Sequence, residues 1–110
     1  MRRVTMMLAA MAVMVSLFAV VAYAAEIQGT DKQDFLNEST GDDTIYGGAR
    51  GDTIYANLYG MDRDKVWGNS GHDSINVTDG DDADRVEGGD GWDVCWGDPN
   101  DHLDCEQEIQ

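Results

Sequence analysis

The sequence predicts an all-β fold, a solenoid of short strands that follows an N-terminal export signal. Three observations predict it. A short motif of aspartate and an apolar residue returns at a regular spacing, glycine-rich turns precede several copies of it, and the first 24 residues differ from the rest in composition. A short fixed period is typical of repeat architectures, in which neighbouring repeats share one core. We therefore expect about three to four coils of a β-solenoid.

Residues 1–24 have the features of a signal peptide. Arg2 and Arg3 precede an apolar run, and Ala22 and Ala24 form a small-residue cleavage pattern. An uncleaved membrane anchor is the alternative, but the run is shorter than the roughly 20 residues that a spanning helix needs. We expect cleavage near Ala24, a secreted domain, and no association with the membrane after cleavage.

The charge of the chain limits its partners. It has 22 acidic residues and 7 basic ones, and two of the basic residues lie in the expected signal. This balance argues against nucleic acid or an anionic membrane as a partner, and it makes the folded chain repel itself unless cations bind. A disordered acidic chain is the alternative. Three tryptophans, four tyrosines and a regular apolar pattern favour a folded domain in the cation-bound state.

The repeated motif is an aspartate followed two residues later by an apolar residue. Its aspartates are Asp34, Asp43, Asp52, Asp64, Asp73, Asp84 and Asp93. Its apolar residues are Leu36, Ile45, Ile54, Val66, Ile75, Val86 and Cys95. Steps of nine residues alternate with steps of up to twelve, so two steps form one unit. The apolar residue is the centre of a three-residue strand and faces the core, while its two neighbours face outward.

Three segments carry a more specific pattern. GGDGWDVCW at 88–96 fits GGxGxDxUx at every position, GNSGHDSIN at 68–76 lacks only the second glycine, and GGARGDTIY at 47–55 has Arg50 in place of the fourth-position glycine. The chain thus resembles the RTX, or hemolysin-type, calcium-binding repeat family. The resemblance implies a parallel β-roll in which six residues of each repeat form a calcium-binding turn and three form a strand. It also implies a bacterial extracellular setting.

The composition of the turns fits this chemistry. Glycine permits close backbone approach, so carbonyl oxygens of a turn can converge on one point, and Ca²⁺ takes six to eight oxygen ligands. The candidate metal-binding residues are Asp34, Asp43, Asp52, Asp64, Asp73, Asp84, Asp90, Asp93, Gly47, Gly68, Gly71, Gly88 and Gly91.

Alternate turns should lie on opposite edges of the roll. One edge receives Asp34, Asp52, Asp73 and Asp93. The other receives Asp43, Asp64 and Asp84, together with both insertions. We expect the strongest sites between the turns that end at Asp52, Asp73 and Asp93, and weaker binding on the inserted edge.

Folding should depend on the ion. Each coil buries only two apolar side chains, worth about 1.5 to 3 kcal/mol each, against an ordering entropy of about 1 to 2 kcal/mol for each residue. Bound metal has to make up the difference, so we expect the calcium-free chain to be largely disordered.

The two ends of the repeat region should differ from it. Residues 25–33 are expected to form a loose N-terminal lead-in or cap, residues 34–96 the repeats, and residues 97–110 a C-terminal cap. Cys95 and Cys105 are the only cysteines, and export favours a disulfide between them that closes the cap.

No nucleophile motif such as GxSxG is present, so the sequence does not predict an enzyme. Tyr46, Tyr55, Trp67 and Trp96 follow the apolar residue and should face outward. They either pack over neighbouring strands, which we favour, or stack on sugar rings. The function predicted is calcium binding. The alternatives are an adhesion or polysaccharide-binding module and an accessory subunit of a secreted enzyme.

Overall fold

The computed structural model describes residues 24–60, 62–80 and 83–110. The signal peptide expected in residues 1–24 lies outside these ranges except for Ala24. The described residues form strands and turns without a helix. Accordingly, these ranges hold no helix that is long and apolar enough to cross a membrane.

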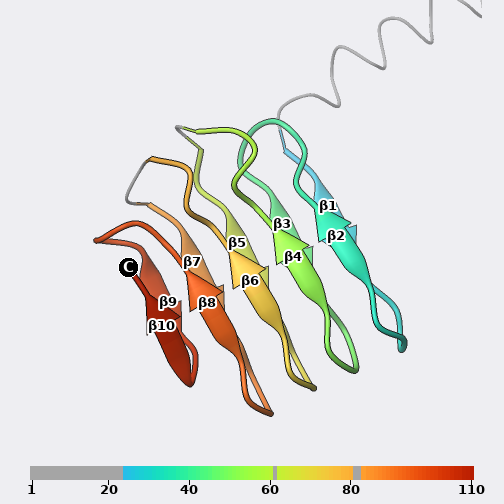
Figure 1. Ribbon diagram of the computed structural model, residues 1–110. Coiled ribbons are helices and arrows are strands. Elements are labelled where there is room, and N and C mark those ends of the chain that lie inside the picture. Colours follow the sequence, from blue (N-terminus) through green and yellow to red (C-terminus); the bar gives the residue numbers. More distant parts are fainter. Residues whose placement is uncertain (1–23, 61, 81–82) are drawn as a thin grey trace, which may run out of the picture.

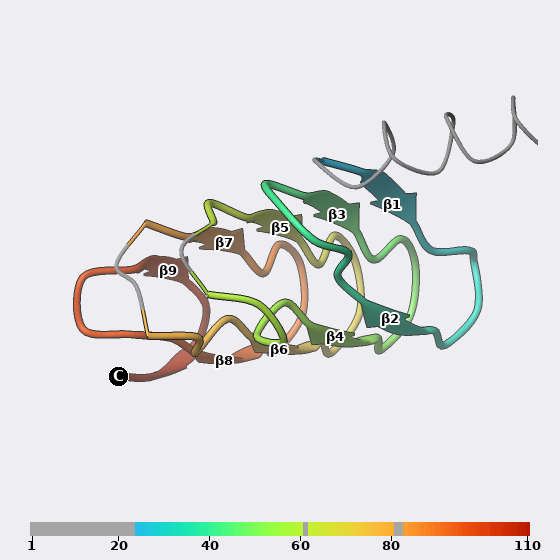
Figure 2. The same ribbon diagram turned by 90° about the horizontal axis from the view of Figure 1, so that it is seen from above.

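The described strands form two parallel sheets of five strands each. Sheet A has the order β1 (Glu26–Gln28), β3 (Thr44–Tyr46), β5 (Lys65–Trp67), β7 (Arg85–Glu87) and β9 (His102–Asp104). Sheet B has the order β10 (Gln107–Ile109), β8 (Val94–Trp96), β6 (Ser74–Asn76), β4 (Thr53–Tyr55) and β2 (Phe35–Asn37). Successive strands alternate between the sheets, which Figure 1 shows from the side and Figure 2 as two rows of strands seen from above. The predicted all-β parallel roll is confirmed.

The core is a pair of apolar ladders between the sheets. In sheet A, Ile45 pairs with Val66 and Val66 with Val86, and in sheet B Ile54 pairs with Ile75, which pairs with Cys95. These side chains are at most 1 % exposed. The central strand residues are therefore buried as the motif predicts, except for Leu36, which is partly buried against the core.

Two further core residues lie outside the strands. Ala56 and Val77 are fully buried, and each directly follows a sheet B strand, at the first position of the next turn. The turns that begin with Ala56 and Val77 depart from the glycine-rich pattern, because their first residue is apolar where the pattern has glycine. The sequence motif did not identify them as core.

Both ends of the repeats extend the sheets. Residues 25–33, expected as a loose lead-in, contain β1, whose Ile27 pairs with Ile45. In the C-terminal segment, β9 pairs with β7 and β10 with β8. β1 thus has a parallel partner that supplies its hydrogen bonds, while the division of the chain into an entry or cap at 25–33, repeats at 34–96 and a C-terminal cap at 97–110 stays a prediction.

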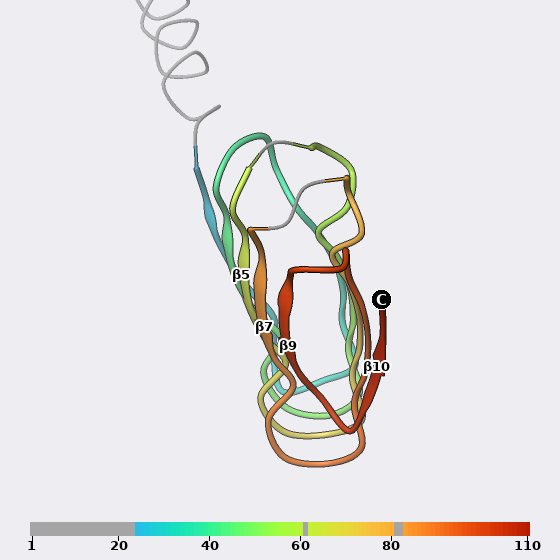
Figure 3. The ribbon, with the colours of Figure 1, turned by 90° about the vertical axis from the view of Figure 1, so that its left-hand side faces the viewer.

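The turns lie along two edges, which the end-on view in Figure 3 separates. The first edge runs from sheet A to sheet B and contains residues 29–34, 47–52, 68–73 and 88–93. The second edge runs from sheet B to sheet A and contains, among the described residues, 38–43, 56–60, 62–64, 77–80, 83–84 and 97–101. The assignment of alternate turns to opposite edges is confirmed, and both insertions lie on the second edge.

Candidate metal centre

Each turn ends at an acidic residue that hydrogen-bonds to the turn stacked on it. On the first edge, the backbone N–H of Asp34, Asp52 and Asp73 donates to Oδ1 of Asp52, Asp73 and Asp93, respectively, at 2.8 Å in each case. Asp93 N–H donates to Glu106 Oε1 at 2.7 Å, so a glutamate takes the last position. One carboxylate oxygen of Asp52, Asp73, Asp93 and Glu106 is thereby used to align neighbouring coils.

The second edge repeats this arrangement. Asp43 N–H donates to Asp64 Oδ1 and Asp64 N–H to Asp84 Oδ1, both at 2.8 Å. The series begins with Ala25 N–H on Asp43 Oδ1 at 2.8 Å and ends with Asp84 N–H on Asp101 Oδ1 at 3.1 Å. We call these two series the first-edge and second-edge aspartate ladders. They place the repeat aspartates in line along each edge.

The second carboxylate oxygen of the central first-edge aspartates lacks a donor within the part of the chain that the structure describes. Oδ2 of Asp52, Asp73 and Asp93 is buried without a hydrogen-bond partner among the described residues. Burial raises the pKa of Asp52 and of Asp93, and it raises that of Asp73 to about 7, with the charges of Asp93 and Asp52 adding to the effect. A row of buried carboxylates lacks counter-charge here, which a bound cation would supply.

Glycine backbone lies directly beside these oxygens. A Cβ placed on Gly47 would lie 2.7 Å from Asp52 Oδ2 and 2.8 Å from the carbonyl oxygen of Gly68 in the next turn. Gly68 has the same relation to Asp73 Oδ2 and the Gly88 carbonyl, and the Cβ of Gly88 would meet Asp93 Oδ2. The space that a side chain would fill is thus bounded by carboxylate and carbonyl oxygens, which is the donor set that Ca²⁺ prefers. These residues fit the ion that the repeats imply.

The other candidates on this edge differ in what they offer. Asp34 Oδ2 already accepts a hydrogen bond from Thr30 N–H at 2.5 Å. The side chain of Asp90 is exposed, and its backbone forms an isolated parallel bridge with Ser70. Gly71 and Gly91 have positive φ angles of 104° and 101°, so they shape the turns. The buried carboxylates of this edge are therefore those of Asp52, Asp73 and Asp93.

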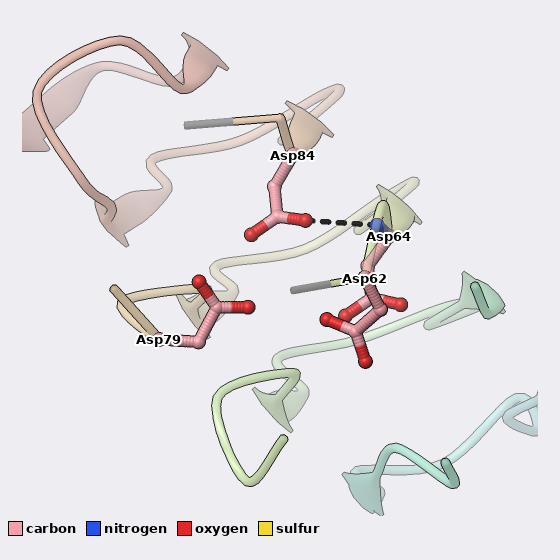
Figure 4. Close-up of side chains that lie close together, drawn as sticks. All are labelled: Asp62, Asp64, Asp79 and Asp84. Atoms are coloured by element: carbon pink, nitrogen blue, oxygen red, sulfur yellow. Dashed lines mark hydrogen bonds between the residues drawn. The ribbon is translucent and has the colours of Figure 1, made fainter. Parts of the chain in front are cut away.

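Carboxylate side chains gather on the second edge. One group contains Asp62, Asp64, Asp79 and Asp84, whose ligand oxygens lie within 4.8 Å of one another and face a common space in Figure 4. A second group, Glu38, Asp43 and Asp64, meets the same criterion, so Asp64 belongs to both. The first group offers four carboxylate oxygens and the second three, so a Ca²⁺ ion would also need carbonyl oxygens or waters to reach six to eight ligands.

Burial and like charge dominate the electrostatics of this edge. Glu38 Oε2 and Asp64 Oδ2 are buried without a hydrogen-bond partner in the ranges described. Glu38 Oε1 is held by the backbone N–H groups of Leu58 and Tyr59, so its carboxylate is fixed in position. Burial raises the pKa of Asp64 to about 9, and the neighbouring carboxyl groups of Glu38 and Asp62 add to the rise. Ionised together, these carboxylates repel one another, and a bound cation would offset that repulsion.

The sequence motif missed several of these acidic residues. Glu38, Asp62 and Asp79 lie in turns that depart from the repeat, and Asp101 and Glu106 end the two ladders. DRD at 62–64 and the acidic run at 79–84 were the available signals for Asp62 and Asp79. The insertions bring carboxylates to the second edge, and the expectation that this edge binds calcium more weakly stays a prediction.

The predicted disulfide is confirmed. Cys95 and Cys105 are bonded, and their Cα atoms lie 6.2 Å apart. Cys105 directly precedes Glu106, which accepts the last hydrogen bond of the first-edge ladder. The bridge therefore holds the ladder's terminal acceptor against the end of the roll.

No curated protein and no solved structure matches the chain. A family model of the RTX calcium-binding nonapeptide repeat (4 copies) matches residues 39–58, 60–83 and 76–101, more than half of the chain. These segments contain most of the stacked turns. They also contain every residue of the two second-edge carboxylate groups except Glu38. The match implies Ca²⁺ as the bound ion. The chain belongs to the RTX calcium-binding nonapeptide repeat family.

Proposed function

We propose that this chain is a secreted, non-catalytic calcium-binding module whose folding is coupled to the ion. The observation that carries the proposal is the row of buried carboxylate oxygens without donors along the first edge, at Asp52, Asp73 and Asp93. When these groups ionise, each destabilises the roll through desolvation and through repulsion from its neighbours. A bound calcium ion offsets both penalties with its positive charge. Because the ion binds only the assembled turns, it stabilises the folded state.

The thin core supports the coupling. Its buried apolar residues are Ile45, Ile54, Ala56, Val66, Ile75, Val77, Val86, Cys95 and Leu103. Most coils contribute only two or three of them, so apolar burial leaves much of the ordering entropy uncompensated. Ion binding to the folded state adds stability that grows with calcium concentration.

Circular dichroism during a calcium titration tests the coupling. The mature chain, from Ala25 onward, is prepared in chelator and titrated with Ca²⁺, with Mg²⁺ as the control ion. We expect a largely disordered spectrum in chelator and a cooperative transition to a β spectrum with Ca²⁺ alone. An ordered spectrum and an unchanged unfolding midpoint in excess chelator would refute the coupling.

A pair of substitutions at Asp73 separates the two roles of its carboxylate. Asp73→Asn keeps an oxygen that can accept the Asp52 N–H, but replaces the other oxygen with a donor. Asp73→Ala removes both. We expect both variants to bind fewer calcium ions by isothermal titration, with Asp73→Ala also more easily unfolded. Asp31→Asn, an exposed carboxylate of the same edge, is the matched control and should keep the full stoichiometry.

Secretion is the second part of the proposal. It is supported by the signal-like sequence of residues 1–24 and by the Cys95–Cys105 disulfide, which is typical of proteins in oxidising compartments. Mass spectrometry of the protein recovered from the culture medium tests it. A mature N-terminus near Ala25 is expected, and a chain retained in the cell with its first 24 residues intact would contradict the proposal.

A further inference from the structure

The outer face of sheet B carries an open groove of about 380 Å³, lined by Thr53, Tyr55, Ser74, Asn76 and Trp96. These residues come from the adjacent strands β4, β6 and β8. Strand pairing places Tyr55, Asn76 and Trp96 in one row across the sheet, and Thr53 and Ser74 in the row beside it. The groove thus has an aromatic side chain at each end and small polar side chains between them.

In the corresponding row of sheet A, the two aromatic side chains lie against each other and leave no space between them. Tyr46 and Trp67 lie on the neighbouring strands β3 and β5, and their rings stack with centroids 5.1 Å apart. Trp67 Nε1 also donates to Glu87 Oε2 at 3.0 Å. The pair therefore covers its own sheet, as we favoured for the outward aromatic residues.

The two aromatic residues of the groove have no such contact with each other. Asn76 stands between them, so their backbones are two strand spacings apart, roughly 9.6 Å. Tyr55 packs instead against Phe35 on its other side, with ring centroids 5.3 Å apart. Two stacking contacts at about 3.5 to 4 Å each need roughly 7 to 8 Å, so this backbone spacing is wide enough for one sugar ring above Asn76.

The polar side chains define what that ring should carry. Asn76 Oδ1 accepts the Thr78 N–H at 2.9 Å, which fixes the amide, while its nitrogen has no partner within the described ranges. The hydroxyl groups of Ser74 and Thr53 also line the groove, and none of its lining residues is charged. The matching ligand has apolar faces and hydroxyl groups at its edge. The strongly acidic chain disfavours one with a negative charge.

We propose that this groove binds a neutral pyranose ring of an oligosaccharide between Tyr55 and Trp96, with the Asn76 amide donating to an oxygen of the sugar. This site is separate from the calcium ligands, which lie in the turns. The calcium-binding module would then also bind sugar, through the outer face of sheet B. Trp67, which faces outward from sheet A, takes no part.

The test uses the mature chain in saturating Ca²⁺ on an array of neutral and acidic oligosaccharides. The best neutral tetrasaccharide is then titrated by isothermal calorimetry, which reports binding whether or not Trp96 is present. We expect Trp96→Ala and Asn76→Ala to weaken binding by roughly tenfold or more, and Trp96→Phe to retain most of it. Trp67→Ala is the matched control, with the same residue change on the other sheet, and should bind normally. Circular dichroism confirms that each variant is folded.

Three results would overturn the proposal. The first is that no neutral oligosaccharide on the array binds, or that only acidic ones do. The second is that binding survives Asn76→Ala and Trp96→Ala. The third is that Trp67→Ala weakens binding as much as Trp96→Ala does. Because Asn76→Ala is a small change on the outer face, it tests the site even if Trp96→Ala fails to fold.

Discussion

Gly71→Ala tests whether the stacking of neighbouring turns fixes the glycine positions. Gly71 has a φ of 104°, and a Cβ built on it would lie 2.7 Å from Cα of Arg50 and closer still to the Arg50 carbonyl group. Two costs follow. An L-residue in the left-handed region loses about 1 to 2 kcal/mol, and displacing packed backbone costs about 1 to 3 kcal/mol. The lower conformational entropy of the unfolded alanine variant offsets about 0.4 to 1 kcal/mol of this loss in stability. We expect a net loss of about 2 to 4 kcal/mol.

Gly80→Ala is the matched control. Gly80 has a φ of 100°, but a Cβ on it would meet no described atom within 4 Å. This variant incurs the backbone cost without the collision, so we expect a loss of only about 0.5 to 1 kcal/mol. Urea unfolding followed by circular dichroism at a fixed, saturating Ca²⁺ concentration measures both, because ion binding contributes to stability in each. Losses that agree within about 0.5 kcal/mol would refute the stacking argument.

The remaining predictions concern the left-handed turn residue, the protons, the disulfide and the second edge. Arg50 has a φ of 66° at the turn position that Gly71 occupies in the next coil, so Arg50→Gly should raise the free energy of unfolding by about 0.5 to 1 kcal/mol; destabilisation in urea would contradict this. The raised pKa of Asp73, about 7, means that its proton stabilises the metal-free roll at low pH and that this stability is lost as pH rises through 7. Calcium affinity, measured by calorimetry, should therefore increase from pH 5.5 to 7.5, and a flat profile would argue against proton displacement at the site. Cys105→Ser, which opens a loop of sequence separation 10, should cost about 3 kcal/mol in urea unfolding, and a loss below about 0.5 kcal/mol would contradict the capping role. Because Asp64 belongs to both carboxylate groups of the second edge, Asp64→Asn should remove more bound calcium than Asp84→Asn, and equal stoichiometries would show that the two groups do not share it.

The regular part of the fold was predictable from sequence because one short motif sets several features at once. An aspartate before each three-residue strand identified the strands β2 to β8 and the inward residue of each. The alternation of the motif also assigned the turns to their edges. A period-two strand leaves little choice of which residue is buried, so burial followed directly from the motif.

The acidic groups of the second edge were less predictable because they depend on how insertions fold. Asp62 and Asp79 lie in turns of different length, and only the stacking of those turns brings them near Asp64 and Asp84. Glu38 lies far from Asp64 in sequence and reaches it only because their coils are adjacent. Spacing along the chain carries no signal for such contacts between insertions.

The ends were less predictable for another reason. β1, β9 and β10 lack a glycine-rich turn before or after them, yet each pairs with a complete strand of the repeats. An exposed parallel strand offers unpaired N–H and carbonyl groups, so a short flanking segment with little sequence preference can pair with it. Glu106 illustrates this, since it completes the first-edge ladder without belonging to any copy of the motif.

The aspartate ladders explain how the roll accommodates insertions without losing register. Between one repeat aspartate and its ladder partner the chain advances 18, 21 or 20 residues on the first edge, yet each bond is 2.8 Å long. On the second edge the separations of 21 and 20 residues also leave that distance at 2.8 Å. The alignment of successive coils is therefore set by the residue just before each strand and not by the length of the turn. One carboxylate oxygen fixes the register, and in Asp52, Asp73 and Asp93 the other oxygen, which has no hydrogen-bond partner among the described residues, can face a cation. The turn ahead of it can then gain residues such as Asp62 and Asp79 on the second edge while both sheets stay paired.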